Sequence, residues 1–219
     1  QRDRQPSGNQ GTRHIKDDAV RELRRVADER ADEGTPPGTT EGLFSDATRD
    51  LILRGEQFGI PRSILDEQIE DVARLVRAFG AQKPMFLLAS EPGSGKTYVL
   101  GGAIRELRAR GAKKIVYVTL RQDLITQIKK DLGAFGVDDV EFVTYPMMRK
   151  TPPVESDAII FDEAHSIKNV KGEGSQQAKA AEAWIDKSRF TVFASATPFE
   201  NPVEAEYLQS TGVFDPIFG

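Results

Sequence analysis

Cysteine is absent from this chain of 219 residues, which excludes disulfide frameworks and thiolate metal sites. The sequence also lacks a run of 18 apolar residues that could cross a membrane, and it has no apolar stretch typical of a signal peptide. We therefore expect an intracellular, soluble protein, cytoplasmic or, in a eukaryote, nuclear. Histidine is scarce too, and His14, one of the two, lies in a polar tail and supports no functional claim.

The hydrophobic content of 38% is enough for one sizeable core. Residues 1–13 are polar and predicted to be disordered, and residues 15–33 suggest an exposed amphipathic helix. The segment 34–40 is rich in Gly, Pro and Thr and marks the expected boundary between this N-terminal part and the folded domain. We expect an N-terminal extension over residues 1–40 and one α/β domain over residues 41–219.

Apolar segments alternate with helix-like segments along the α/β domain. Two helices are predicted first, over 45–59 with Ser45 as a cap candidate and over 61–80 with Pro61 at the first position. Strands are then expected near 85–89, 114–119, 140–144, 158–162 and 190–195, and helices near 96–110, 121–134 and 175–187. This alternation is typical of a parallel sheet with helices on both faces.

Residues 90–97 read Ser-Glu-Pro-Gly-Ser-Gly-Lys-Thr between a strand and a helix, which is the setting of an ATP-binding phosphate loop. Glycines let backbone N–H groups converge on phosphate oxygens, and the helix N-terminus adds its dipole. Lys96 would reach the β- and γ-phosphates, and Thr97 would hold Mg²⁺. Because Ser90 replaces the usual first Gly, an ordinary surface turn is the alternative. The expected nucleotide-binding residues are Glu91, Pro92, Gly93, Ser94, Gly95, Lys96 and Thr97.

A second motif, Asp162-Glu163-Ala164-His165, follows the apolar segment 158–161. Its carboxylates are expected at the edge of a parallel sheet where ligands bind, facing the same crevice as the phosphate loop. Asp162 is placed to hold Mg²⁺ through its water shell, and Glu163 to orient and deprotonate the attacking water. A solvated helix start is the alternative, which the preceding strand and the upstream phosphate loop disfavour.

A third motif, Ser195-Ala196-Thr197, follows the apolar segment 191–194. In this order the three motifs resemble those of the first motor lobe of superfamily 2 helicases and translocases. The resemblance covers residues 62–211 and implies a RecA-like three-layer sandwich with a mostly parallel sheet. It also implies that Ser195 and Thr197 couple the nucleotide state to the nucleic-acid track, and that His165 contacts the third motif.

Three segments resemble the SWI/SNF-type branch of double-strand translocases: residues 162–169, 197–201 and 143–149. Ser-Ala-Thr-Pro and the residues after it also resemble the helicase portions of phage and plasmid polyproteins and of strawberry-notch-like helicases, so the branch stays open. The residues after Ser195 are far fewer than the roughly 100 to 150 that a domain takes, so the family's second lobe, with its arginine finger, does not fit there. Since the chain also begins with Gln1, we expect it to be a piece of a larger protein.

The resemblance assigns further residues to ligands. Thr119 and Arg121 occupy the place where the family contacts the sugar-phosphate backbone, and Thr144 belongs to the segment that resembles Thr-Tyr-x-x-x-Arg. The family also places an adenine-binding glutamine ahead of the phosphate loop. Gln68 is the candidate for it and Gln57 a weaker one, with an ordinary solvated glutamine as the alternative.

The net charge of −4 argues against nucleic-acid binding through bulk charge. Cations nevertheless concentrate between residues 105 and 130. Arg105, Arg108 and Arg110 are expected on the solvated face of the helix after the phosphate loop rather than on a nucleic acid.

Together the motifs predict the ATP-binding first lobe of a nucleic-acid-dependent ATPase, a helicase or double-strand DNA translocase that uses ATP and Mg²⁺. Its expected partners are nucleic acid, with DNA favoured over RNA, and a second RecA-like lobe. Hydrolysis is expected to be weak without an arginine finger. A nucleotide-regulated protein-binding module is the alternative. A GTPase is disfavoured because no Asn-Lys-x-Asp motif follows, and a small-molecule kinase would leave the second and third motifs unexplained.

Overall fold

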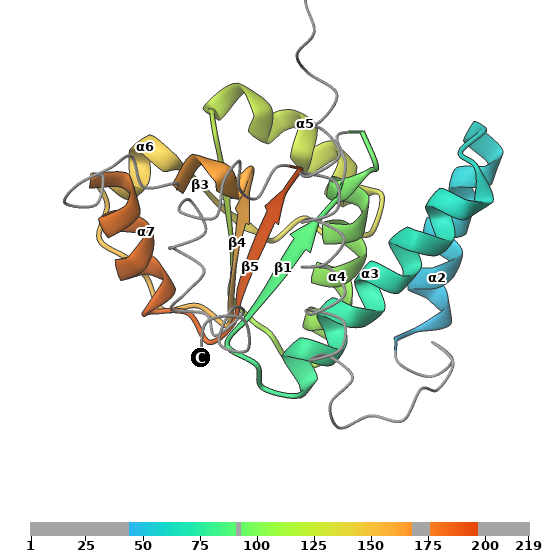
Figure 1. Cartoon of the computed structure of the whole chain (residues 1–219), viewed down its shortest axis with the longest axis horizontal. Coiled ribbons are helices and arrows are strands. Elements are labelled where there is room, and N and C mark those ends of the chain that lie inside the picture. Colours follow the sequence, from blue (N-terminus) through green and yellow to red (C-terminus); the bar gives the residue numbers. More distant parts are fainter. Residues whose placement is uncertain (1–43, 91–92, 168–175, 197–219) are drawn as a thin grey trace, which may run out of the picture.

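The computed structural model describes residues 44–90, 93–167 and 176–196 (Figure 1). Five strands form one sheet in the order β1-β5-β4-β2-β3, and every pair of neighbours is parallel. The strands are β1 (Met85–Ala89), β2 (Ile115–Thr119), β3 (Glu141–Thr144), β4 (Ala158–Asp162) and β5 (Thr191–Ser195). The predicted α/β fold with a parallel sheet is confirmed, and each strand begins within one residue of its expected position.

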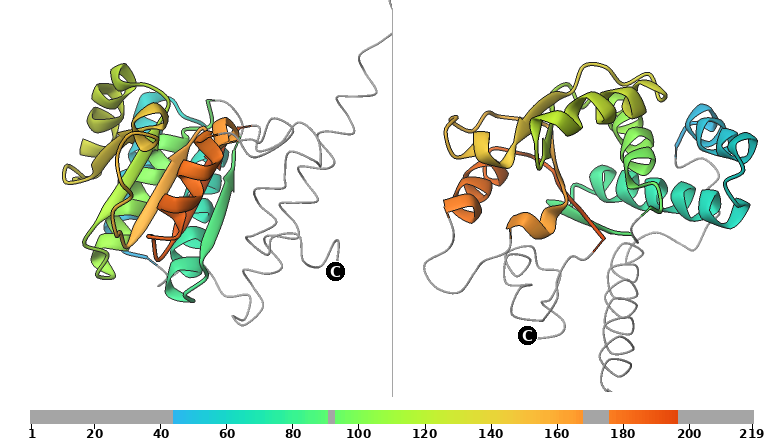
Figure 2. Two further views of the ribbon diagram at one scale, coloured as in Figure 1. Left: turned by 90° about the vertical axis from the view of Figure 1, so that its left-hand side faces the viewer. Right: turned by 90° about the horizontal axis from the view of Figure 1, so that it is seen from above.

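Helices cover both faces of this sheet, as the alternation of segments predicted (Figures 1 and 2). α3, α4 and α5 lie on one side, and α6 and α7 on the other. The helices are α2 (Asp46–Leu53), η1 (Arg54–Phe58), α3 (Arg62–Gly80), α4 (Lys96–Ala109), α5 (Gln122–Gly133), α6 (Tyr145–Met148), η2 (Ala164–Ile167) and α7 (Gln176–Ile185). None of these helices is both long and apolar enough to cross a membrane.

Some local details differ from the sequence prediction. The expected first helix is divided into α2 and η1. η1 is followed by Gly59, whose φ of 77° lies in the left-handed region that glycine tolerates. Pro61 precedes α3 as its N-cap instead of occupying its first helical position. The turns α6 and η2 were not predicted, because four residues are too few to show helical periodicity. The N-terminal extension expected over residues 1–40 lies outside the described residues.

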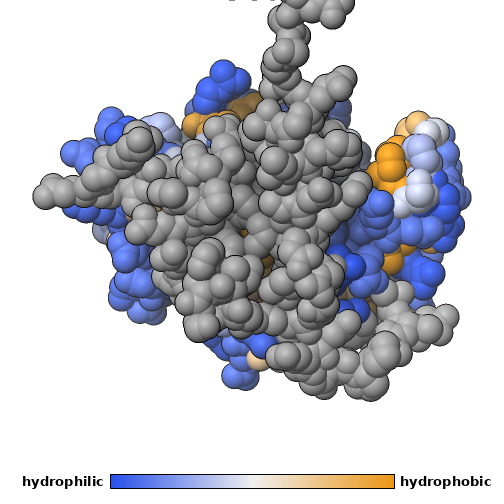
Figure 3. Space-filling model, viewed as in Figure 1, coloured by the Kyte–Doolittle hydropathy of each residue, from blue (hydrophilic) through white to orange (hydrophobic). Residues whose placement is uncertain are grey.

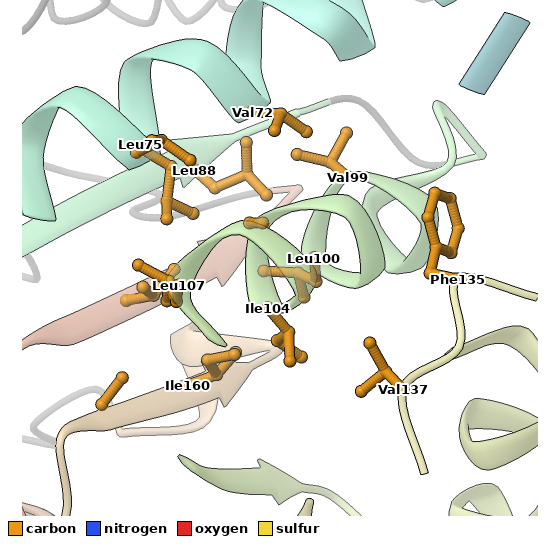
Figure 4. Packing of buried hydrophobic residues seen from close by; sticks show 14 of the residues in the cluster. Val72, Leu75, Leu88, Val99, Leu100, Ile104, Leu107, Phe135, Val137 and Ile160 are labelled. Carbon is orange, nitrogen blue, oxygen red and sulfur yellow. The ribbon is translucent and has the colours of Figure 1, made fainter. Parts of the chain in front are cut away.

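The larger hydrophobic core packs α3 and α4 against one face of the sheet (Figure 4). Val72 of α3, Leu100 and Ile104 of α4 and Ile160 of β4 are almost fully buried there. Alternate strand residues point to opposite faces, so the neighbours of Ile160 along β4 enter a second core with α7. In that core Phe161 stacks on Phe193, with ring centroids 5.5 Å apart. Each such aliphatic or aromatic side chain contributes roughly 1.5 to 3 kcal/mol by burial.

A buried carboxylate attaches the first described helix to this core. Glu106 of α4 is 1% exposed and accepts hydrogen bonds from the hydroxyls of Ser45, at 2.5 Å, and Thr48. The guanidinium of Arg110 donates to its other oxygen at 2.7 Å. Ser45 is at the predicted N-cap position of α2, but its side chain bonds Glu106 instead of capping the helix. α2 is therefore fastened to α4 by polar contacts as well as by packing.

One patch of apolar surface, in orange at the right of Figure 3, lies where α2, η1 and α3 meet, and another is visible near the top of the same view. Phe58 of η1 is 83% exposed, and the other exposed large hydrophobic residues of the described chain are Tyr98 and Met147. Most of the remaining coloured surface in that view is hydrophilic.

Candidate nucleotide-binding site

The three sequence motifs meet at the carboxyl edge of the sheet, because β5 lies between β1 and β4 (Figure 1). Ala89 at the end of β1 pairs with Ser195, and Asp162 at the end of β4 pairs with Ala194. The backbone N–H of Ser90 donates to the oxygen of Ser195 at 3.3 Å. The strand before the phosphate loop is thus hydrogen-bonded to the start of the Ser-Ala-Thr motif.

In its described part, the predicted phosphate loop has backbone angles that suit a phosphate cradle. Gly93 and Gly95 have φ angles of 77° and 81°, in the left-handed region that favours glycine. Gly95 is the N-cap of α4, so the helix begins at Lys96 and its first N–H groups face the loop. Thr97 lies in the first turn. Of the predicted nucleotide-binding residues, Glu91 and Pro92 lie outside the described chain.

Gln68 of α3 contacts the backbone of this loop through its side chain. Its side-chain Nε2 donates to the main-chain oxygen of Ser94 at 2.7 Å, and the residue is only 6% exposed. A Cβ atom added to Gly95 would collide with the same Nε2 atom. The sequence proposed Gln68 as an adenine ligand, which stays a prediction; its contact with the loop backbone could not be read from the sequence. The weaker candidate, Gln57, is exposed on η1.

Asp162 is held by hydrogen bonds to both carboxylate oxygens. The hydroxyl of Tyr117 donates to Oδ2 at 3.0 Å, and the N–H of Glu163 donates to Oδ1 at 3.0 Å. Burial raises the pKa of the Asp162 carboxyl, while the Tyr117 bond and the charge of Lys96 act in the opposite direction. The positive charge of Lys96, at the start of α4, thus favours the ionised form of Asp162, at the end of β4. Burial and the Asp162 charge likewise raise the pKa of Tyr117.

Glu163 occupies an unusual backbone position. Its φ of 52° lies in the left-handed region, which costs a residue other than glycine of the order of 1 to 3 kcal/mol and is found most often at functional sites. His165 lies close to two partners through Nδ1, the Glu163 carboxylate at 3.2 Å and the Ser195 hydroxyl at 3.3 Å. Glu163, His165 and Ser195 therefore form a connected set that links the second and third motifs.

The residues expected to contact nucleic acid fall into two groups. Arg121 has an exposed side chain beside Asp123, with 3.2 Å between the charged atoms. Thr119 and Thr144 are buried, and the hydroxyl of Thr144 accepts a hydrogen bond from the N–H of Met147 in α6. Their role in nucleic-acid contact stays a prediction. Thr197 lies outside the described residues.

The three arginines near the end of α4 have structural partners rather than a purely solvated position. Arg105 donates to the main-chain oxygen of Phe135 at 3.1 Å, and Arg108 pairs with the Asp139 carboxylate at 2.9 Å. Both fasten the segment after α5 to α4. Together with the bond from Arg110 to Glu106 described above, these contacts account for the three arginines without any nucleic acid.

The oxygen donors at this edge of the sheet suit a magnesium ion that is bound together with a nucleotide. Within the described ranges no group of three or more His, Asp or Glu side chains could hold a metal ion unaided. Mg²⁺ is usually bound by one or two protein oxygens, with phosphates and waters completing the shell. The Thr97 hydroxyl and the Asp162 carboxylate are oxygen donors of this kind.

Comparison with known proteins agrees with this architecture. Residues 62–151 match the family described as type III restriction enzyme, res subunit (ResIII). The SWI2/SNF2 ATPase core of Sulfolobus solfataricus in complex with dsDNA is similar in structure, with 19% identity and a TM-score of 0.54 over 66% of this chain and 34% of that chain. The same core domain alone gives 18% identity and a TM-score of 0.51 over 68% and 34%.

No curated protein sequence matches the chain. The chain spans about a third of the length of the two archaeal structures, and at this identity the likeness concerns the fold. The described domain has a RecA-like fold, as the SWI2/SNF2 ATPase core does.

Proposed function

We propose that this chain is the ATP-binding first lobe of a nucleic-acid-dependent ATPase, a helicase or DNA translocase. The observation that carries the proposal is the convergence of three elements at one sheet edge. These are the glycine loop at the start of α4, the Asp162-Glu163 pair after β4, and Ser195 at the end of β5. An isolated turn or an isolated acidic pair would not produce this arrangement.

Nucleotide binding would begin at the phosphate loop. The N–H groups at the start of α4 would receive the phosphates, with Lys96 neutralising the charge of the β- and γ-phosphates. The bond from Gln68 to Ser94 holds the loop backbone in place before the nucleotide arrives. Thr97 and Asp162 would hold magnesium, which when bound supplies further neutralisation of phosphate charge.

Glu163 would act on the attacking water. Its carboxylate would accept a proton as the water oxygen bonds to the γ-phosphorus, while the bond from that phosphorus to the bridging oxygen breaks and ADP leaves. The contact of Glu163 with His165 restricts where the carboxylate can point. Because His165 also approaches Ser195, a movement of the Ser-Ala-Thr motif would change the position of the base.

DNA is the proposed track, because one structurally similar protein is a complex with dsDNA. The exposed Arg121 is a candidate for contact with its phosphates. A second lobe, supplied by a longer protein, would add an arginine finger. Since such a residue contributes roughly 10³ to 10⁵ in turnover, the chain alone should bind ATP but hydrolyse it slowly.

A titration with a fluorescent ATP analogue, with and without Mg²⁺, tests the proposal. Saturable binding that ATP displaces better than GTP should disappear in Lys96→Ala. It should persist in Lys83→Ala, which removes an exposed lysine ahead of β1. Failure of the folded, unchanged chain to bind, both alone and within the longer protein, would contradict the proposal.

A further inference from the structure

Tyr117 lies in the middle of β2 with its whole side chain buried, yet its hydroxyl reaches the candidate magnesium ligand. The residue is 0% exposed, and its ring packs beside Phe142, with 5.4 Å between ring centroids. Tyr117 pairs with Ile160 of β4, and Asp162 lies two residues further along the same strand. Tyr117 and Asp162 are therefore diagonal neighbours on one face of the sheet, a spacing that a tyrosine side chain can bridge.

The bond from Tyr117 fixes the carboxylate in a way that the backbone alone does not. The N–H of Glu163 holds Oδ1, and the Tyr117 hydroxyl holds Oδ2, so both ends of the carboxylate are restrained. A carboxylate oxygen has two acceptor positions, so each can still accept a hydrogen bond from a metal-bound water. We propose that Tyr117 is a positioning residue for magnesium, which aims the Asp162 carboxylate at the metal's water shell from inside the core. This inference rests on the proposed function.

A second tyrosine provides a matched comparison. Tyr145 is also buried, and its hydroxyl donates to the main-chain oxygen of Asp162 at 2.9 Å. It therefore holds the end of β4, whereas Tyr117 holds the carboxylate itself. Tyr117→Phe and Tyr145→Phe each remove one buried hydroxyl next to the same residue, but Tyr117→Phe alone removes a donor to the side chain that would serve magnesium.

The experiment measures the Mg²⁺ concentration that gives half-maximal binding of the fluorescent ATP analogue. Loss of a partner that orients a metal ligand typically weakens metal affinity by about 10- to 100-fold, so Tyr117→Phe should raise this midpoint by roughly that factor. Its affinity for the analogue without Mg²⁺ should be unchanged. Tyr145→Phe should shift the midpoint much less.

Each outcome is decisive. An unchanged midpoint in a folded Tyr117→Phe variant, or equal shifts in both variants, overturns the inference while leaving the proposed function in place. Absence of any Mg²⁺ dependence in the unchanged chain overturns the proposed function, and this inference with it.

If Tyr117→Phe does not fold, the double variant with Asp162→Asn decides the question. Recovery of folding in the double variant shows that the hydroxyl acts on the Asp162 carboxylate, as the inference requires. Loss of folding in both variants would show that the hydroxyl is needed for packing of the core, and it would overturn the inference.

Discussion

The side-chain amide of Gln68 in α3 donates a hydrogen bond to the main-chain oxygen of Ser94 in the phosphate loop, 2.7 Å away. The loop is thus supported by a helix that precedes β1 in the chain. A contact that holds the loop backbone affects binding of the phosphates and does not depend on the base of the nucleotide. A contact with adenine would instead distinguish ATP from GTP.

Gln68→Ala should therefore weaken ATP and GTP binding by the same factor. A buried hydrogen bond contributes about 0.5 to 1.5 kcal/mol, which corresponds to a loss of roughly 2- to 10-fold. Competition titrations with both nucleotides measure the two factors, with Gln127→Ala on the exposed face of α5 as the control. Loss of ATP affinity with GTP affinity preserved would instead assign Gln68 to the base.

Replacing Gly95 by alanine should be more damaging than replacing Gly93. Both have left-handed φ angles, so each substitution carries a backbone cost of about 1 to 2 kcal/mol. The Cβ at residue 93 would meet nothing within 4 Å, but at residue 95 it would collide with Gln68 Nε2. Urea unfolding of the two variants measures the difference. The double variant Gln68→Ala, Gly95→Ala should recover the part due to the collision, and its failure to do so would show that backbone strain dominates.

The Glu106 network should make the chain sensitive to acid. Burial acts to raise the pKa of Glu106, but the hydrogen bonds from Ser45, Thr48 and Arg110 outweigh it and leave the pKa below its ordinary value of 4.5. A lowered pKa means that the folded state favours the ionised form. The stabilisation is therefore complete above about pH 4.5 and is lost as the pH falls through the lower pKa of the folded state.

Glu106→Gln should remove that acid dependence and lower the free energy of unfolding at neutral pH by about 1 to 3 kcal/mol, because an NH₂ group replaces one of the two carboxylate oxygens that accept the hydrogen bonds of Ser45, Thr48 and Arg110. Unfolding curves at pH 7 and below pH 4.5 measure both effects, with the exposed Glu182→Gln as the control. Equal acid sensitivity in Glu106→Gln and the unchanged chain would show that other carboxylates cause it.

Glu163→Gln should separate binding from hydrolysis. Glutamine keeps the shape of glutamate but accepts no proton, so the affinity for ATP should be retained while turnover falls by roughly 10²- to 10⁴-fold. Single-turnover measurements beside the binding titration test this, with Glu155→Gln on the exposed surface as the control. A variant with normal turnover would remove Glu163 from the role of base.

Local sequence patterns predicted the sheet well and the contacts between distant side chains poorly. β-branched and aromatic runs placed the strands, and the glycine loop and acidic pair placed two sides of the site, because each pattern lies within a few residues. The bonds from Gln68 to Ser94 and from Tyr117 to Asp162 join residues that the fold brings together. Tyr117 carried one visible signal, a phenol in the middle of an otherwise aliphatic strand, since a buried tyrosine hydroxyl usually needs a partner.

The pairing of β1 with β5 has a consequence for how the chain reaches this fold during synthesis. Met85 of β1 is translated before β2, β3 and β4, whereas its partner Thr191 is translated after them. β2 pairs with both β3 and β4, so these three strands can assemble during translation, before β5 is available. β1 can pair only after β5 has been translated, and closing the long loop between these two strands is slow. The strand that leads into the phosphate loop is therefore translated before β2, β3 and β4 but pairs only after them, and bound nucleotide can assist folding only at that last step.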